Sequence, residues 1–177
     1  HYGWHATLKA PFRLAAGTML ADLERELEGY CGAQHAFQLP HMDVRRLGDF
    51  LALVPVGTHA PTERIAAECV QRFDRYRAPP SAEEIARRLA GRLDFVERGL
   101  LERWGYPFVL ERFRFHFTLT GPLSGGDDRL VPALLDHACE HFRDVWRTPL
   151  SFDAITLFEQ PAPERPFTVR TRVQFGR

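Results

Sequence analysis

Residues 5–12 read HATLKAPF, and residues 116–123 read HFTLTGPL. Histidine, threonine, leucine and proline occupy the same four places in both strings. One His-x-Thr triplet carries little information, but a shared leucine and proline make a chance recurrence rare. Because similar patterns of helix and strand follow both strings, we interpret the chain as an internal duplication.

The first string is predicted to lie on a strand over residues 2–10 that ends at Pro11. Side chains two residues apart on a strand point to the same face. His5, Thr7 and Lys9 are therefore expected on one face, toward a cleft.

The second string is predicted to lie on a strand over residues 112–121. The same alternation places Arg114, His116, Thr118 and Thr120 on one face, with phenylalanines on the other. If the two halves are related by a twofold axis, their histidines oppose each other across one cleft.

The remaining sequence predicts the elements around these strands. Apolar spacing and turn residues indicate helices at residues 19–31, 61–76, 81–93, 94–104 and 129–142. They indicate extended segments at residues 35–39, 42–47, 50–56, 150–158 and 166–175. Ser81 and Glu84 form the pattern of a capping box at the start of one helix.

This order predicts an α+β fold with two lobes related by a pseudo-twofold axis. Antiparallel sheets are expected to line a central groove, with helices outside. The predicted parts are a first lobe at residues 1–57, a helical insertion at 58–108 and a second lobe at 109–177. Together they form one two-lobed domain.

Composition narrows the possible partners. Lys plus Arg and Asp plus Glu both number 23, so the net charge is zero, which argues against binding long nucleic acid. The apolar runs are too short to span a bilayer, and no signal-peptide pattern is present. Three widely spaced cysteines indicate thiols in a reducing cytoplasm. The start at His1 leaves open whether a segment precedes it.

The paired motif suits phosphate ester chemistry. A neutral imidazole can accept a proton while the other, protonated, donates one, because histidine titrates near neutrality. Threonine hydroxyls can donate to phosphate oxygens. Lys9 and Arg114 are candidates to offset the negative charge, Thr120 lies on the same face as His116, and Tyr2 is a candidate to stack on a sugar or base.

A metal is not expected. Two histidines are too few ligands, and no carboxylate or cysteine recurs beside them. His137 and His141 are four apart, but without the glutamate of a metalloprotease motif they are read as surface or structural histidines.

At HATL and HFTL the sequence resembles the two-histidine (2H) phosphoesterase superfamily, whose signature is two H-Φ-[ST]-Φ motifs. The longer strings YGWHATLKAPFRL and RFRFHFTLTGPL resemble an uncharacterised bacterial branch associated with phosphonate-metabolism operons. This resemblance implies a bilobal α+β fold with a central groove and a metal-independent activity on cyclic phosphates or 2′–5′ linked oligonucleotides. It also implies catalytic roles for His5, Thr7, His116 and Thr118.

The predicted function is hydrolysis of a small cyclic phosphate, or of a 2′–5′ or 2′,3′-type phosphodiester, by a cytoplasmic bacterial enzyme in phosphonate metabolism. No cofactor and no membrane are expected, and the expected partner is a small phosphorylated sugar or nucleotide. The alternatives are an RNA-end ligase or transesterase, a non-catalytic module that binds a phosphorylated ligand, and an interaction module built on residues 58–108. The exact substrate, the regiochemistry, the roles of the two histidines, the role of the insertion and the oligomeric state stay open.

Overall fold

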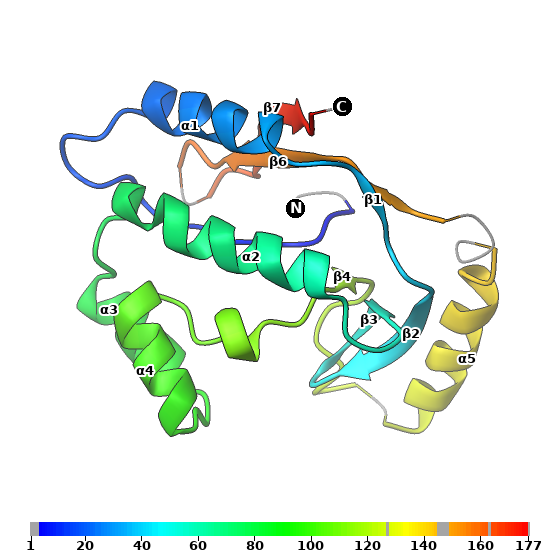
Figure 1. Cartoon of the computed structure of the whole chain (residues 1–177). Helices are drawn as coiled ribbons and strands as arrows, with labels where there is room; N and C mark the ends of the chain where they lie inside the picture. Colours follow the sequence, from blue (N-terminus) through cyan, green and yellow to red (C-terminus); the bar gives the residue numbers. More distant parts are fainter. Residues whose placement is uncertain (1–3, 127, 145–148, 163, 177) are drawn as a thin grey trace. The chain divides into compact units, whose positions relative to one another are not determined.

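The chain folds as a mixture of α-helices and antiparallel sheets (Figure 1). The computed structural model describes residues 4–126, 128–144, 149–162 and 164–176. Within them lie five α-helices and seven strands. The expected α+β class is therefore confirmed, whereas the pseudo-twofold axis stays a prediction.

The described residues form two compact units. The first, which we call the sheet unit, consists of His1–Ala6, Glu24–His59 and His116–Arg177. The second, which we call the helical unit, consists of Thr7–Leu23 and Ala60–Phe115.

One half of the sheet unit is a three-stranded antiparallel sheet. Strands β2 (Met42–Leu47) and β3 (Phe50–Pro55) form a hairpin, and the short strand β4 (Phe117–Thr118) pairs with β3. Helix α5 (Val131–His141) packs along β2 (Figure 1). Leu51, Ala52 and Leu53 of β3 are fully buried, so this strand is the centre of the local core.

The other half of the sheet unit is the hairpin of β6 (Ala154–Glu159) and β7 (Thr168–Gln174), with a register shift after Leu157. Helix α1 (Leu20–Gly32) lies over this hairpin from Glu24 onward (Figure 1). The amide of Gly176 donates to the carbonyl of Cys31 at 3.1 Å, which fixes the end of the helix.

A small pair of strands belongs to the same unit. Strand β1 (Phe37–Gln38) pairs antiparallel with β5 (Ser151–Phe152). The rings of Phe37 and Phe152 stack with centroids 5.0 Å apart, and Phe175 lies against Phe152. These aromatic rings give the short ladder a core of its own.

The helical unit contains α2 (Ala60–Arg72), α3 (Ala82–Leu89) and α4 (Phe95–Trp104), with 3₁₀ turns at Phe73–Tyr76 and Leu110–Arg112. Its core includes Val70, Leu100 and Val109.

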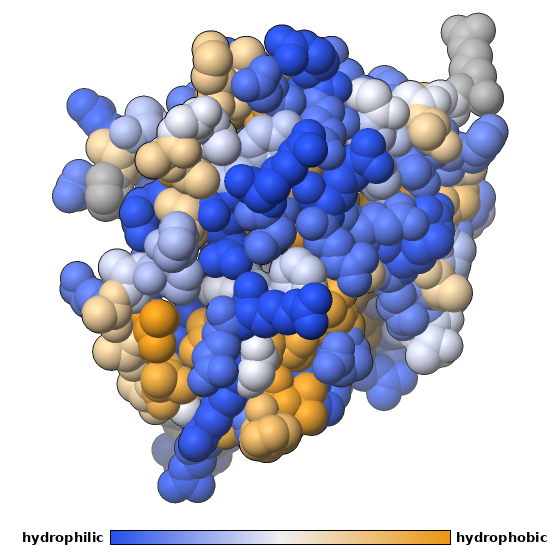
Figure 2. Space-filling view, turned by 60° about the vertical axis from the view of Figure 1, so that its left-hand side comes forward, coloured by the Kyte–Doolittle hydropathy of each residue, from blue (hydrophilic) through white to orange (hydrophobic). Residues whose placement is uncertain are grey.

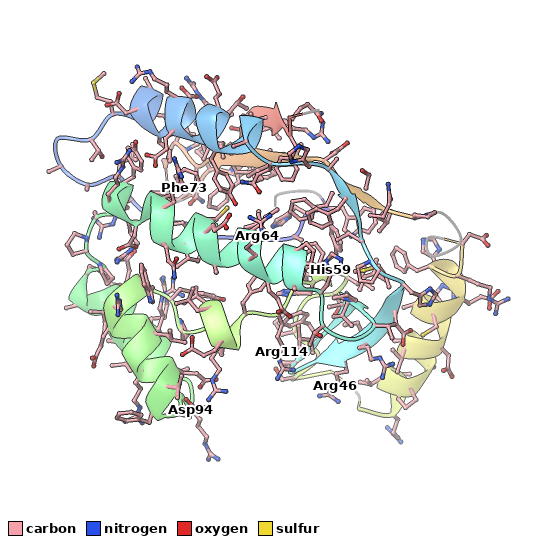
Figure 3. All side chains as sticks on the ribbon, in the orientation of Figure 1. Arg46, His59, Arg64, Phe73, Asp94 and Arg114 are labelled. Atoms are coloured by element: carbon pink, nitrogen blue, oxygen red, sulfur yellow. The ribbon has the colours of Figure 1, made fainter. Side chains whose placement is uncertain are left out.

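Capping fixes where two of these helices begin. Helix α3 starts at the predicted capping box of Ser81 and Glu84, and α4 starts at a second box made by Asp94 and Glu97. Asp94 also accepts from Arg112 at 2.6 Å (Figure 3).

The helices and most extended segments lie where the sequence predicts them, but the two motif strands do not. Residues 4–10 form no strand, and of the predicted strand at 112–121 only β4 forms. Thr120 explains the early end of β4, because its hydroxyl accepts from the amide of Leu51 at 3.0 Å and takes a place that a backbone carbonyl would hold.

The helical unit exposes apolar side chains on α3 and α4. Phe95 is 91% exposed, and Leu89 and Val96 are also exposed. In Figure 2, apolar side chains gather in the lower part of the face, beside a band of hydrophilic ones. This exposure keeps open the alternative that this segment is an interaction module.

Gly105 gives a test of how α4 ends. It follows the helix with φ of +73°, and a Cβ at this position would lie 2.9 Å from Nη1 of Arg77. Gly105→Ala should therefore lower the free energy of unfolding by about 1–2 kcal/mol, since the left-handed conformation penalises a side chain. The matched control is Gly99→Ala inside α4, where nothing lies within 4 Å of the added Cβ and helix propensity predicts a gain of up to about 1 kcal/mol. Equal effects of the two changes in urea unfolding would contradict this account.

Cys31 gives a test of burial in the sheet unit. The side chain has no exposed surface, and burial raises the pKa of its thiol from 9.0 to about 11. Between these values the unfolded chain loses the proton while the folded chain keeps it, so the free energy of unfolding should fall as pH rises. Cys31→Ala should remove the contribution of this thiol to the decrease in the free energy of unfolding between pH 9 and 11. Identical pH profiles for the two proteins in urea unfolding would show that the thiol is not buried.

Candidate functional site

The histidines of the two sequence motifs both belong to the sheet unit, and their chain neighbours are in contact. Trp4 directly precedes His5, and Phe117 directly follows His116. The rings of Trp4 and Phe117 lie with centroids 5.0 Å apart, and Trp4 also lies 6.4 Å from the ring of Phe142 at the end of α5. An aromatic pair of this kind contributes about 0.5–1.5 kcal/mol beyond its buried area. The contact joins two segments that are far apart in the sequence.

Both histidines are half-buried and held by aromatic rings. The ring of His5 lies 5.7 Å from that of Phe158 on β6, and the ring of His116 lies 5.6 Å from that of Phe50 at the start of β3. The two imidazoles are thus positioned by two different hairpins. Each keeps part of its surface open to a ligand.

The two threonines of the second motif differ. Thr118 is exposed on β4, opposite Ala52 in the ladder. The hydroxyl of Thr120 accepts from the amide of Leu51 and donates to the carbonyl of Gly121 at 2.9 Å. Thr118 thus presents a hydroxyl to solvent, whereas Thr120 ends the ladder.

Three predicted residues lie in the helical unit, and one lies outside the described residues. Thr7 and Arg114 are exposed (Figure 3 labels Arg114), and Tyr2 is not described. Lys9 is largely buried, with its ammonium donating to the carbonyl of Val70 at 3.0 Å. The structure thus assigns His5, His116 and Thr118 to one unit and Lys9 to the other.

The sequence did not predict the charged cluster that Lys9 forms with Asp74 and Arg77. Asp74 accepts from the Lys9 ammonium at 3.4 Å and from Nε of Arg77 at 2.7 Å. Burial lowers the pKa of Lys9; Asp74 opposes this shift, and the charge of Arg77 adds to it. The available signal was the three-residue spacing of Asp74 and Arg77 at the end of a helix, a common pattern that points to no particular partner.

The described residues contain no group of three or more histidine, cysteine, aspartate or glutamate side chains that could hold a metal ion. The three cysteines, all within the described part of the chain, form no disulfide. No described helix has the length and apolar character needed to cross a membrane.

These observations define an α+β protein in which the histidines of two repeated motifs lie in one unit. The chain belongs to the family described as "Protein of unknown function (DUF1045)", which matches residues 7–168. No solved structure matches it.

Two curated relatives carry the name "Ribose 1,5-bisphosphate phosphokinase PhnN". The protein from Janthinobacterium sp. (strain Marseille) is 40% identical over 176 residues, which are 99% of this chain and 39% of that protein. The protein from Laribacter hongkongensis (strain HLHK9) is 34% identical over 160 residues, which are 90% of this chain and 36% of that protein. This chain thus spans well under half the length of either relative.

These names contradict the predicted hydrolysis of a phosphodiester. A phosphokinase transfers a phosphoryl group to an acceptor, whereas the predicted enzyme opens an ester with water. The prediction of a hydrolase is therefore wrong on this evidence, while the expectation of a small phosphorylated sugar agrees with what the relatives' name says they act on. The error arose because paired acid–base histidines suit several kinds of phosphate chemistry.

The chain lacks one feature common in nucleotide-dependent kinases. A P-loop needs the pattern G-x-x-x-x-G-K-[ST], and its lysine contacts the β- and γ-phosphates. Lys9 is the only lysine among the 177 residues, and it stands in the string ATLKAP. No P-loop is therefore present in this sequence.

The different environments of Thr118 and Thr120 lead to a prediction. Thr120→Val should lower the free energy of unfolding by about 1–3 kcal/mol, because the buried amide of Leu51 loses its acceptor. Thr118→Val should change it by less than about 0.5 kcal/mol, since that hydroxyl is exposed. Urea unfolding of both variants measures the difference, and a larger loss for Thr118→Val would show that the roles are reversed.

Proposed function

We propose that this chain is the part of a ribose 1,5-bisphosphate phosphokinase-like enzyme that binds the phosphorylated ribose. The observation that carries the proposal is the contact of Trp4 with Phe117, which brings the chain neighbours of His5 and His116 together in one unit. The name of the two relatives supports the choice of ligand.

The binding chemistry follows from the exposed groups. A protonated imidazole and a threonine hydroxyl both donate hydrogen bonds, and phosphate oxygens accept them. Bonds to a charged acceptor are about twice as strong as neutral ones. His5, His116 and Thr118 supply such donors within the sheet unit. Thr7, the matching threonine of the first motif, belongs to the helical unit.

The proposal places the sugar phosphate on this chain and leaves the phosphoryl donor to another part of a longer enzyme. Two facts support this division: the sequence has no P-loop, and the relatives are more than twice as long as the matched region.

We also propose that the chain keeps the two-lobed arrangement of the 2H superfamily and belongs to the branch associated with phosphonate-metabolism operons. The element order supports this, because each motif is followed by a helix, a short strand and a hairpin: α1, β1 and β2–β3 first, then α5, β5 and β6–β7. The two short strands β1 and β5 pair with each other.

Binding of ribose 1,5-bisphosphate to the chain tests the proposal. His5→Ala and His116→Ala should each weaken binding about tenfold or more in isothermal titration calorimetry, because a hydrogen bond to a charged group contributes about 1.5–3 kcal/mol. Ribose without phosphate should not bind measurably. The matched control is His137→Ala, an exposed histidine on α5, which should bind as the unchanged chain does.

Two results would contradict the proposal. One is unchanged affinity in both histidine variants, which would place the ligand elsewhere. The other is equal binding of ribose and its bisphosphate, which would show that phosphate is not recognised. Circular dichroism of each variant establishes that a loss of binding is not a loss of fold.

A further inference from the structure

We infer that the helical unit contains a second anion site, a pocket built around Lys9 and Arg77 that binds a small oxyanion such as a phosphate or carboxylate head group. The pocket has a volume of about 250 Å³ including its open mouth, and its walls include Val70, Trp104 and Tyr106. All of these residues belong to the helical unit, so the inference does not depend on the proposed site in the sheet unit.

Lys9 supplies the first donor. An ammonium has three hydrogens, and the described hydrogen bonds of Lys9 use two: one to the carbonyl of Val70 and one to the more distant carboxylate of Asp74. The ammonium also lies 5.3 Å from the centre of the Phe12 ring, a cation–π contact that leaves the third hydrogen without a hydrogen bond. The side chain is only 11% exposed. A buried ammonium with one donor to spare gains from an additional acceptor.

Arg77 supplies the second donor group. Its Nε and Nη2 donate to Asp74 at 2.7 and 3.2 Å, and Nη2 also donates to the carbonyl of Arg103 at 3.1 Å. These contacts engage one edge and the end of the guanidinium, and the described residues offer no acceptor to Nη1. Nη1 lies at Gly105, where a side chain would come within 2.9 Å of it. A glycine at this place lets the guanidinium lie on the pocket wall.

The charges of the cluster do not cancel. Asp74 is one carboxylate between two cations, and it does not line the pocket. The pKa of Lys9 is lowered first by burial, and the nearby Arg77 lowers it further. An anion in the pocket would offset this excess positive charge. The guanidinium of Arg88, 4.7 Å from the ring centre of Tyr106, adds a third cation beside one wall.

The walls and the size define the class of ligand. Aromatic and aliphatic side chains form much of the wall around the donors, and hydrogen bonds are electrostatically stronger in surroundings of low polarity. The 250 Å³ includes open solvent, and the enclosed space is about 20 Å³, so the pocket admits only a small head group. Phosphate and carboxylate share the required chemistry, because the oxygens of either group can accept from the Lys9 ammonium and from Nη1 of Arg77.

The single lysine makes a direct test possible without any substitution. Chain grown with lysine labelled at ¹³Cε gives one lysine signal in an NMR spectrum, and that signal reports on Lys9 alone. Inorganic phosphate, acetate and chloride are titrated separately at constant ionic strength. We expect a saturable shift with phosphate or acetate and none with chloride, and the stronger of the two identifies the head group. A shift that is equal in all three salts, or absent, overturns the inference.

Variants separate this pocket from the proposed sugar-phosphate site. Arg77→Gln should reduce the affinity for the anion about tenfold or more, whereas the control Arg64→Gln on α2, whose partner Glu68 is on the same helix, should not (Figure 3). The double change of His5 and His116 to alanine should leave the Lys9 titration unchanged. If Arg77→Gln does not fold, the anion titration of the unchanged chain alone tests whether the pocket at Lys9 binds an anion. A loss of the Lys9 shift in the histidine variant would assign the anion to the other site and overturn the inference.

Discussion

The contact between Trp4 and Phe117 is the interaction on which the pairing of the two motif histidines depends. It joins the start of the chain to β4, and through Phe142 it reaches the end of α5. Each ring is the chain neighbour of a motif histidine. Because side chains at adjacent positions are tied to one backbone, this packing limits how far the two motifs can separate. The histidines are then oriented by Phe158 and Phe50, which belong to different hairpins.

The sequence predicts elements well where local physics fixes them. The capping box at Ser81 and Glu84, the helix predicted at residues 129–142 and the extended segment predicted at 50–56 all appear in the structure, in α3, α5 and β3. The motif strands fail because a strand exists only through its partner. The alternation of residues 4–10 contains no information about whether a partner lies beside them. The hydroxyl of Thr120 takes the place of a backbone carbonyl in the ladder and ends β4. The alternation of apolar and polar residues does not predict this end.

The residues of the candidate site could also be predicted only in part, because tertiary contacts decide which of them lie together. The repeated motif identifies His5 and His116, and the Trp4–Phe117 contact brings their segments together. The assignment of Lys9 to that site rested on strand alternation, which does not occur there. Lys9 instead lies in the helical unit beside Asp74 and Arg77, which follow it by more than 60 residues. Distant pairings of this kind come from tertiary packing, which local sequence patterns do not show. A motif shared among phosphate enzymes likewise does not specify which reaction the relatives catalyse.

The central claim is that His5 and His116 together bind one phosphate group of the phosphorylated ribose. A double-mutant cycle on the affinity for ribose 1,5-bisphosphate tests this most directly, with alanine at either position and at both. The account predicts that the double variant loses less binding free energy than the two single variants combined, because each change alone already disrupts a shared phosphate. Strictly additive losses would mean that the histidines act at separate places and would contradict the account.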